Sequence, residues 1–301
     1  MKYALCVVHY GDSAPLLECL QSSFELATPP VARYVLWNDP QRPNSELPAA
    51  LLKHVTLITP QINLGYAGGA NLAVQTALDT GRCEAVWLLN NDTILDRDCA
   101  DVLIGVLDAD ASVALVGPRL IDHESGRIWH DGGEIIWPSG QPVSFGYGAE
   151  DNAAGDPVET GFVCGCAPLI RGAAFRSVGG FDERFFLCYE DADLSLRLKR
   201  RGWRLSHAPK ARVRHRGSLN IGAGSAQQRY YMLRNRLLFI ELHAPPGGGA
   251  HRAARRLRRE ARLRALRYQL TGRRDEARAL RAALADAAAR RWGERRLDAG
   301  A

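Results

Sequence analysis

Short apolar runs that suit β-strands alternate with helical patterns over about the first 120 residues of this 301-residue chain. The expected strands are 3–8, 34–37, 55–59, 85–89 and 113–116, and the expected helices are 16–26, 70–78 and 101–107. Strands separated by helices are typical of βαβ units. We therefore predict an α/β fold with a mostly parallel, Rossmann-like sheet and helices on both faces. Ligands of such sheets bind at the carboxyl ends of the strands.

The pattern changes after the fifth expected strand. Residues 119–170 are rich in Gly and Trp, which favours a hairpin-rich insertion, and helices are expected from about Asp191 and over 226–242. We expect one domain over 1–243, divided into a nucleotide-binding half (1–118) and an acceptor half (119–243). Pro245 to Gly249 predict a linker at 244–249, followed by a basic helical tail at 250–301.

The charge of the chain is unevenly distributed. Residues 251–300 carry sixteen Arg against six acids, so this segment has a charge of +10 while the whole chain has +6. The mildly acidic remainder argues against a nucleic-acid binder. The tail could instead contact the anionic inner surface of a membrane as a peripheral anchor. The alternatives are that it packs on the catalytic domain or pairs with another copy in a homodimer.

The sequence also bears on location and redox state. The apolar run at 4–8 is too short for a signal peptide, and no later run reaches about 18 residues, so we expect a cytoplasmic protein. Seven cysteines lack zinc-site spacing, and we expect reduced thiols. Cys164 and Cys166 have the period of a strand and are expected on one buried face.

The segment AVWLLNNDT (85–93) places Asn90, Asn91 and Asp92 directly after a buried strand. Mg²⁺ usually takes one or two protein carboxylates together with substrate phosphates, so Asp92 could bind Mg²⁺ or Mn²⁺ beside a diphosphate. A plain strand-to-helix turn, with Asp92 or Thr93 as a helix cap, is the alternative.

Two further segments carry candidate residues. In CYEDADL, Glu190 and Asp191 stand at an expected helix start, where Asp191 could accept an alcohol proton, whereas Asp193 fits simple helix-end charge complementarity. In NLGYAGGANLA (63–73), glycines open a helix expected near Ala70 and could bring the backbone close to a phosphate or sugar. Tight packing of these glycines is the alternative.

The last candidates lie in RVRHRGS (212–218) and YYMLRN (230–235). His215 could be a nitrogen ligand of the same metal, and Arg234 could contact a phosphate. Considered alone, each residue is more often structural.

Taken in order, VVHY, NLGYAGGAN, LLNNDT, GGFDERFFLCYEDADLSLRLKRRGW, HRGS and YYMLRN resemble the second family of glycosyltransferases, which has the A-type nucleotide-sugar fold (GT-A). Within it, the sequence resembles the rhamnosyltransferases of bacterial surface-polysaccharide assembly. The resemblance covers about residues 3–242.

The resemblance implies a role for each matching residue. Asp191 matches the catalytic base, with Glu190 beside it as an acceptor contact, and Asp92 and His215 match the metal ligands. Asn90 replaces the first acid of the family's D-x-D motif. The resemblance implies that Asn38 and Asp39 contact the base and ribose, and the donor-binding residues that we predict in all are Asn38, Asp39, Asn63, Gly65, Gly68, Asn71, Asn90, Asn91 and Arg234. Pro40 to Arg42 replace the Ser-rich continuation that usually follows the pair at 38–39.

We therefore predict a metal-dependent, inverting glycosyltransferase that uses a nucleoside diphosphate sugar, with thymidine-diphosphate rhamnose as the first candidate and a uridine-diphosphate hexose as the second. The acceptor would be a hydroxyl of a glycan or lipid-linked glycan. A nucleotidyltransferase of related fold would require a basic, Gly-rich loop after the first strand, where this chain has HYGDSAP. A non-catalytic nucleotide-sugar-binding protein is the other alternative, suggested by Asn90.

Overall fold

The structure is a computed structural model that describes residues 1–42, 47–152, 155–217, 222, 224–247 and 249–295. Its strands are β1 (Tyr3–His9), β2 (Arg33–Trp37), β3 (Thr56–Ile58), β4 (Ala85–Asn90), β5 (Thr93–Leu95), β6 (Val113–Asp122), β7 (Ile128–His130), β8 (Gly133–Ile136), β9 (Gln141–Ser144), β10 (Val158–Glu159), β11 (Leu169–Arg171) and β12 (Arg204–His215). Its helices are α1 (Ser13–Phe24), α2 (Ala49–Leu52), α3 (Gly65–Asp79), α4 (Cys99–Ala109), α5 (Gly172–Ser177), α6 (Glu190–Arg200), α7 (Ala226–His243), α8 (Gly249–Leu270) and α9 (Arg274–Ala288).

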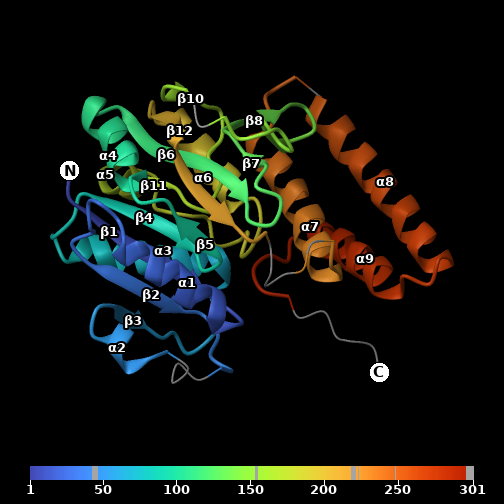
Figure 1. The fold of residues 1–301 in the computed structure, drawn as a ribbon. Coiled ribbons are helices and arrows are strands. Elements are labelled where there is room, and N and C mark those ends of the chain that lie inside the picture. The colour runs from blue at the N-terminus through green and yellow to red at the C-terminus, as the bar shows by residue number, and fades with distance from the viewer. Residues whose placement is uncertain (43–46, 153–154, 218–221, 223, 248, 296–301) are drawn as a thin grey trace.

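The main sheet has the strand order β10-β12-β6-β11-β4-β1-β2-β3 (Figure 1). Strands β4, β1, β2 and β3 are parallel neighbours, and β6 is parallel to β12. Strand β11 lies antiparallel between β4 and β6. Helices α1 and α4 cover one face, whereas α3, α5 and α6 cover the other. The predicted α/β fold is confirmed.

Several elements differ from the sequence expectation. Helix α3 begins at Gly65 and not near Ala70. Cys164 and Cys166 lie in a turn and not on a strand, because β11 begins only at Leu169. All seven cysteines are free, as expected. The insertion forms the short strands β7 to β10, and β8 pairs with β9 as a separate hairpin.

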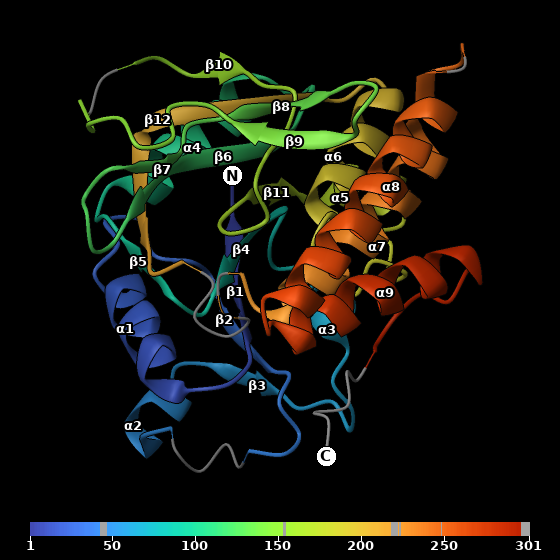
Figure 2. The same ribbon diagram turned by 90° about the vertical axis from the view of Figure 1, so that its right-hand side faces the viewer.

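The basic tail forms the two helices α8 and α9, which lie beside α7 at one side of the sheet (Figures 1 and 2). Tyr230 of α7 donates a hydrogen bond to Asp286 of α9 at 2.7 Å, and Arg291 forms an ion pair with the same carboxylate. Apolar side chains of all three helices share one buried cluster. Packing on the catalytic domain, one of the alternatives for the tail, is therefore what the structure shows up to residue 295.

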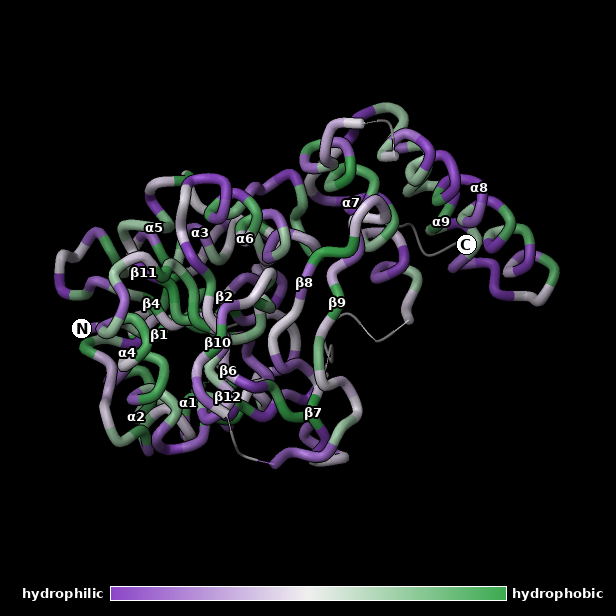
Figure 3. The backbone as a smooth tube through the Cα atoms, turned by 90° about the horizontal axis from the view of Figure 1, so that it is seen from above, coloured by the Kyte–Doolittle hydropathy of each residue, from purple (hydrophilic) through white to green (hydrophobic). Residues whose placement is uncertain are grey.

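Hydrophilic and hydrophobic residues alternate along α8 (Figure 3). Among the described residues, none of the helices combines the length and the apolar character that crossing a bilayer requires. Residues 296–301 of the tail, Gly248 of the expected linker and Ser218 of the HRGS motif lie outside the described residues.

Candidate active site

A cavity of about 700 Å³ opens at the carboxyl ends of β1, β2 and β4. Its walls also include the turn at 164–166, the start of α6, strand β9, and parts of α7 and α8. The predicted site residues that line it are Asn38, Asn63, Gly65, Asn90, Asn91, Asp92, Glu190, Asp191 and His215. One cavity thus brings together residues that are far apart in the sequence.

Asp92 and His215 meet because of the short strand β5. This strand directly follows Asp92 and pairs with the end of β12, which places Thr93 opposite His215. His215 Nε2 lies 3.1 Å from Asp92 Oδ1, and the His215 ring lies against Trp129 with centroids 4.8 Å apart. The 3.1 Å contact does not have hydrogen-bond geometry, so both ring nitrogens lack a hydrogen-bond partner among the described residues.

These two side chains fit a divalent cation. A buried carboxylate and a buried imidazole without hydrogen bonds are the O and N ligands that Mn²⁺ accepts, and Mg²⁺ sites often use one carboxylate with phosphate and water oxygens. Asn90 Oδ1 is also buried without a partner among the described residues. No group of three or more His, Cys, Asp or Glu side chains that could hold a metal occurs in the described part of the chain.

Asn38 and Asn63 shape the turn that precedes α3. The Asn38 amide donates to Gly65 O at 2.8 Å and to Asn63 Oδ1, and its Oδ1 accepts from Leu64 N at 2.9 Å. Asn63 Oδ1 also accepts from Gly65 N at 2.8 Å. Gly65 has φ +69°, and a Cβ there would lie 2.5 Å from Phe186, so this glycine is required for close packing. The close approach predicted at Gly65 is thus to the protein's own 181–189 loop.

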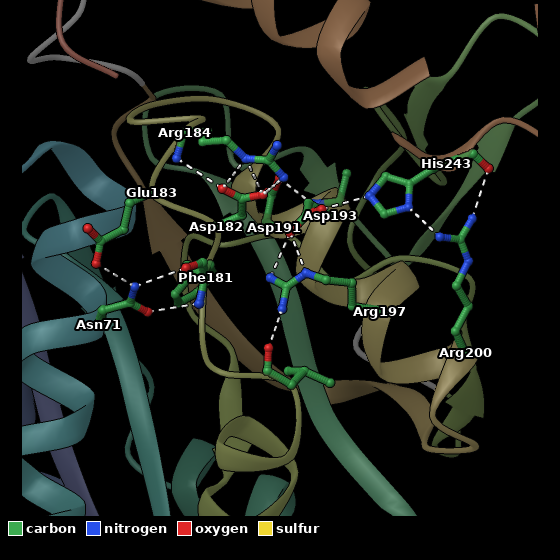
Figure 4. A network of polar contacts seen from close by, with 12 residues as sticks. Asn71, Phe181, Asp182, Glu183, Arg184, Asp191, Asp193, Arg197, Arg200 and His243 are labelled. Carbon is green, nitrogen blue, oxygen red and sulfur yellow. Dashed lines mark hydrogen bonds and ion pairs between the residues drawn. The ribbon is translucent and has the colours of Figure 1, made fainter. Parts of the chain in front are cut away.

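Other residues proposed for donor binding have protein partners away from the cavity. Asn71 clamps the backbone of Phe181 through both ends of its amide and donates to Glu183 (Figure 4). A Cβ at Gly68 would lie 3.1 Å from Leu64. Asp39 accepts from Gln41 N at 3.2 Å and is buried. Asn91 lines the cavity, but its amide donates to His9 Nδ1 at 3.0 Å and so anchors the loop after β1.

Asp191 stands in the first turn of α6 with its carboxylate held by two backbone amides. Oδ2 accepts from Gly165 N at 2.9 Å, and Oδ1 accepts from Ala192 N at 2.8 Å. Burial raises the pKa of Asp191, and the hydrogen bonds to Gly165 and Ala192 oppose this rise. Burial, together with the adjacent Asp191 charge, raises the pKa of Glu190 well above its ordinary value. Glu190 Oε2 lacks a hydrogen-bond partner among the described residues.

The loop before α6 is strained, and a buried network holds the helix that follows. Phe186, Cys188 and Tyr189 have φ of 59°, 68° and 75°, in the left-handed region that non-glycine residues seldom adopt. Asn235 of α7 donates to the carbonyls of this loop, including that of Cys188 at 2.8 Å. The surrounding contacts therefore fix the loop that delivers Glu190 and Asp191.

Asp193, next in the same helix turn, is the centre of that network (Figure 4). It pairs with Arg197 at 2.6 Å and with His243 Nε2 at 2.7 Å, and Arg200 donates to His243 Nδ1 at 2.8 Å. Because arginine is only a donor, His243 Nδ1 must accept, and its proton resides on Nε2. Asp193 thus joins α6 to α7, a role beyond the helix-end charge complementarity expected from the sequence.

The structure contradicts a phosphate contact for Arg234. Its side chain is 1% exposed and does not line the cavity. Its guanidinium donates to Gly293 O at 2.7 Å, Phe185 O at 3.2 Å and Arg184 O at 3.3 Å. It joins α7 to the 181–189 loop and to the chain after α9. The motif YYMLRN alone does not show whether its arginine contacts a phosphate or holds neighbouring parts of the fold together.

Sequence reasoning also missed residues that complete the site. Tyr66 donates a short hydrogen bond to Gly165 O, and Gly165 N in turn holds Asp191. Cys164 and Cys166 flank this turn and line the cavity. The motif GFVCGCAP contains a glycine between two cysteines, which is a turn signal that the period-two interpretation overlooked. The walls from α7 and α8 could not be placed without the tertiary structure.

Comparisons with known proteins find relatives of this chain. Over 235 residues the chain is 27% identical to the N-acetylglucosaminyl-diphospho-decaprenol L-rhamnosyltransferase of Mycobacterium tuberculosis, covering 70% of this chain and 75% of the relative. It is 30% identical over 162 residues to the O-antigen biosynthesis protein RfbC of Myxococcus xanthus, covering 50% of this chain and 12% of that protein.

Two solved structures share the fold. GalNAc-T7 with UDP, GalNAc and Mn²⁺ matches with a TM-score of 0.61 at 15% identity, covering 77% of this chain and 47% of that one. TarS of S. aureus matches with a TM-score of 0.52 at 14% identity, covering 83% and 41%. The chain thus spans less than half the length of either structure.

A family model described as glycosyl transferase family group 2 matches residues 85–271. The matched region begins at β4, contains Asp92, Asp191 and His215, and continues through α8. It crosses the linker that the sequence predicts at 244–249. The chain therefore belongs to glycosyl transferase family group 2.

Proposed function

We propose that this glycosyltransferase is inverting and that Asp191 is its catalytic base. The observation that supports the proposal is the position of the Asp191 carboxylate, which two backbone amides hold at the wall of the cavity that also contains Asp92 and His215. The base and the residues facing the leaving group come from different elements. A single in-line displacement requires that separation.

The reaction would proceed in one step. The acceptor oxygen forms a bond to the anomeric carbon as the bond from that carbon to the diphosphate oxygen breaks, and the hydroxyl proton passes to Asp191. Burial raises the pKa of Asp191, which strengthens it as a base. Glu190 offers Oε2 as an acceptor contact. A divalent cation held by Asp92 and His215, when bound, would supply positive charge beside the leaving diphosphate.

We propose Asn63, Gly65 and Asn90 as donor contacts, because they line the cavity and Asn90 Oδ1 is unpartnered in the described structure. Asn38 and Asn91 would act as positioning residues, since their amides are engaged with backbone and His9. For the donor we favour thymidine-diphosphate rhamnose and for the acceptor a lipid-linked glycan, because a relative at 27% identity is named as a rhamnosyltransferase acting on a diphospho-decaprenol-linked sugar. A uridine-diphosphate hexose is the second candidate, since GalNAc-T7 was solved with UDP.

Transfer from thymidine-diphosphate rhamnose, measured with Mn²⁺ in wild type and Asp191→Asn, tests the proposal. Asn is nearly isosteric but cannot take the proton, so turnover should fall by about 10²–10⁴-fold while nucleotide binding persists. Asp79→Asn, an exposed substitution outside the cavity, is the control. Turnover of Asp191→Asn within a few-fold of wild type would refute the role of Asp191. Nucleotide binding without transfer to any acceptor would favour the non-catalytic alternative.

We also propose that the outward face of α8 contacts the cytoplasmic surface of an anionic membrane. Leu263, Leu266 and Leu270 are 58%, 53% and 78% exposed, and they recur at helical spacing between arginines. Each basic residue near such a surface contributes about 1 kcal/mol. Replacing the three leucines with Gln should reduce sedimentation with anionic liposomes, whereas unchanged sedimentation would contradict the contact. Deleting the tail would be a poorer test, because α9 is packed on α7.

A further inference from the structure

The active-site cavity continues past Asp191 into a groove between α7 and α8. We call this the helical groove and define its apolar lining as Met232, Leu233, Leu257, Ala261 and Leu280. Met232 is 42% exposed. Helices α7 and α8 both pack on α9 and touch each other much less (Figure 2). Met232 and Leu257 keep exposed surface in the groove, whereas Leu233, Ala261 and Leu280 are buried.

The same groove is lined by more basic than acidic side chains. Arg229 and Arg236 of α7 and Arg264 of α8 line the cavity together with one acid, Glu260. Arg236 donates through Nε to Ser139 O at 2.9 Å, which orients its guanidinium. Glu260 is paired with Arg256 at 2.7 Å, and the charges of Arg236 and Arg264 also lower the pKa of its carboxyl. Along the described part of the groove, three guanidinium groups thus accompany one carboxylate that already has a partner.

These arginines line the same cavity as Asp191 and Asp92. Burial raises the pKa of Tyr189, with Arg236 opposing and Asp191 adding to the rise, so Arg236 and Asp191 both lie near Tyr189. A ligand of the groove would therefore reach the cavity that contains the candidate base.

A ligand of this groove should combine anionic and apolar parts. Arginine forms bidentate, charge-assisted hydrogen bonds with phosphate, and covering exposed apolar side chains is favourable. A saccharide alone has neither part. We propose that the helical groove binds an isoprenoid diphosphate, the carrier of the acceptor sugar, with Arg236 and Arg264 contacting the diphosphate and Met232 and Leu257 the hydrocarbon. This inference rests on the proposed function, in which the acceptor is lipid-linked.

Calorimetry with farnesyl diphosphate tests the proposal on the full chain. Saturating thymidine diphosphate and Mn²⁺ should be present, so that the donor site is filled. Farnesyl diphosphate should bind, whereas farnesol and inorganic diphosphate, each lacking one half of the ligand, should bind much more weakly. The double variant Arg236→Gln, Arg264→Gln should bind farnesyl diphosphate at least about 10-fold more weakly, because it loses charge-assisted hydrogen bonds.

The control is Arg259→Gln, since Arg259 is an exposed arginine of α8 that does not line the cavity. It should bind farnesyl diphosphate as wild type does. Leu257→Asn tests the apolar half and should also weaken binding, with thermal unfolding measured to show that each variant folds. Equal affinity in wild type and in the folded double variant would overturn the proposal. A failed transfer assay would leave this binding result intact, so the two failures can be told apart.

Discussion

Replacing Arg234 with Met separates a structural role from a phosphate-binding role. The substitution keeps most of the side-chain volume but removes every donor. Gly293 O and the Asn235 side-chain carbonyl would lose their bonds to Arg234, whereas Phe185 O would keep its bond from Asn235 at 2.7 Å and Arg184 O its bond from Gly293 N at 3.1 Å. Leaving a buried acceptor unsatisfied costs about 1–3 kcal/mol, so two such carbonyls lower the unfolding free energy by about 4 kcal/mol.

For a chain of this size, 1 kcal/mol shifts the melting temperature by about 2 °C, so Arg234→Met should melt about 8 °C below wild type. Thermal unfolding followed by circular dichroism measures the shift, and calorimetry measures the affinity for thymidine diphosphate with Mn²⁺ at a temperature where the variant is folded. Arg252→Met, an exposed change on α8, should alter stability by less than about 0.5 kcal/mol. Unchanged melting together with lost nucleotide affinity would refute this reasoning and restore the phosphate role.

Four further outcomes follow from the site. Asp92→Ala should abolish the Mn²⁺-dependent part of nucleotide diphosphate binding, and calorimetry showing the same Mn²⁺ dependence as wild type would place the metal elsewhere. Glu190→Gln should melt at a higher temperature than wild type, and the difference should grow as the pH rises above about 4.5. Burial raises the folded-state pKa of Glu190, so the wild type loses stability as the pH rises through this range. An equal difference in melting temperature at every pH would contradict this. The acid limb of kcat/KM should lie above pH 3.8, since burial raises the pKa of Asp191 and the base must be ionised; a limb below that pH would argue against Asp191. Gly65→Ala should destabilise the chain by about 1 kcal/mol or more through a clash with Phe186 and a left-handed φ, and a neutral effect in chemical unfolding would show that the loop can shift.

Much of the fold could be predicted because hydrophobic periodicity reflects burial. Strand β1 is buried along its whole length and reads as a continuous apolar run, and the strands and helices expected over the first 120 residues all occur. Strand β5 was missed, and the strand expected around Cys164 and Cys166 was placed too early, since β11 begins only at Leu169. These short strands nevertheless bring His215 to Asp92 and separate β4 from β6.

The candidate site, like the fold, could be predicted from the sequence only in part. Asp92, Asp191 and His215 could be proposed because their motifs occur together in the order of the glycosyltransferase family that the sequence resembles, although each residue alone also fits a structural role. Arg234 and Asn71 could not be assigned, because their partners are backbone carbonyls and amides of distant loops that side-chain chemistry does not reveal. The charge of the tail predicted a basic surface. The helical groove could be recognised only from the packing of α8 beside α7.

The anomeric configuration of the product tests the proposed mechanism most directly. Proton NMR of the disaccharide formed by wild-type enzyme compares the anomeric configuration of its new glycosidic linkage with that of the donor. A single displacement with Asp191 as base predicts the opposite configuration. Retention of the donor's configuration would contradict the account, because it would require a second displacement or a front-face reaction that this arrangement of Asp191 does not explain.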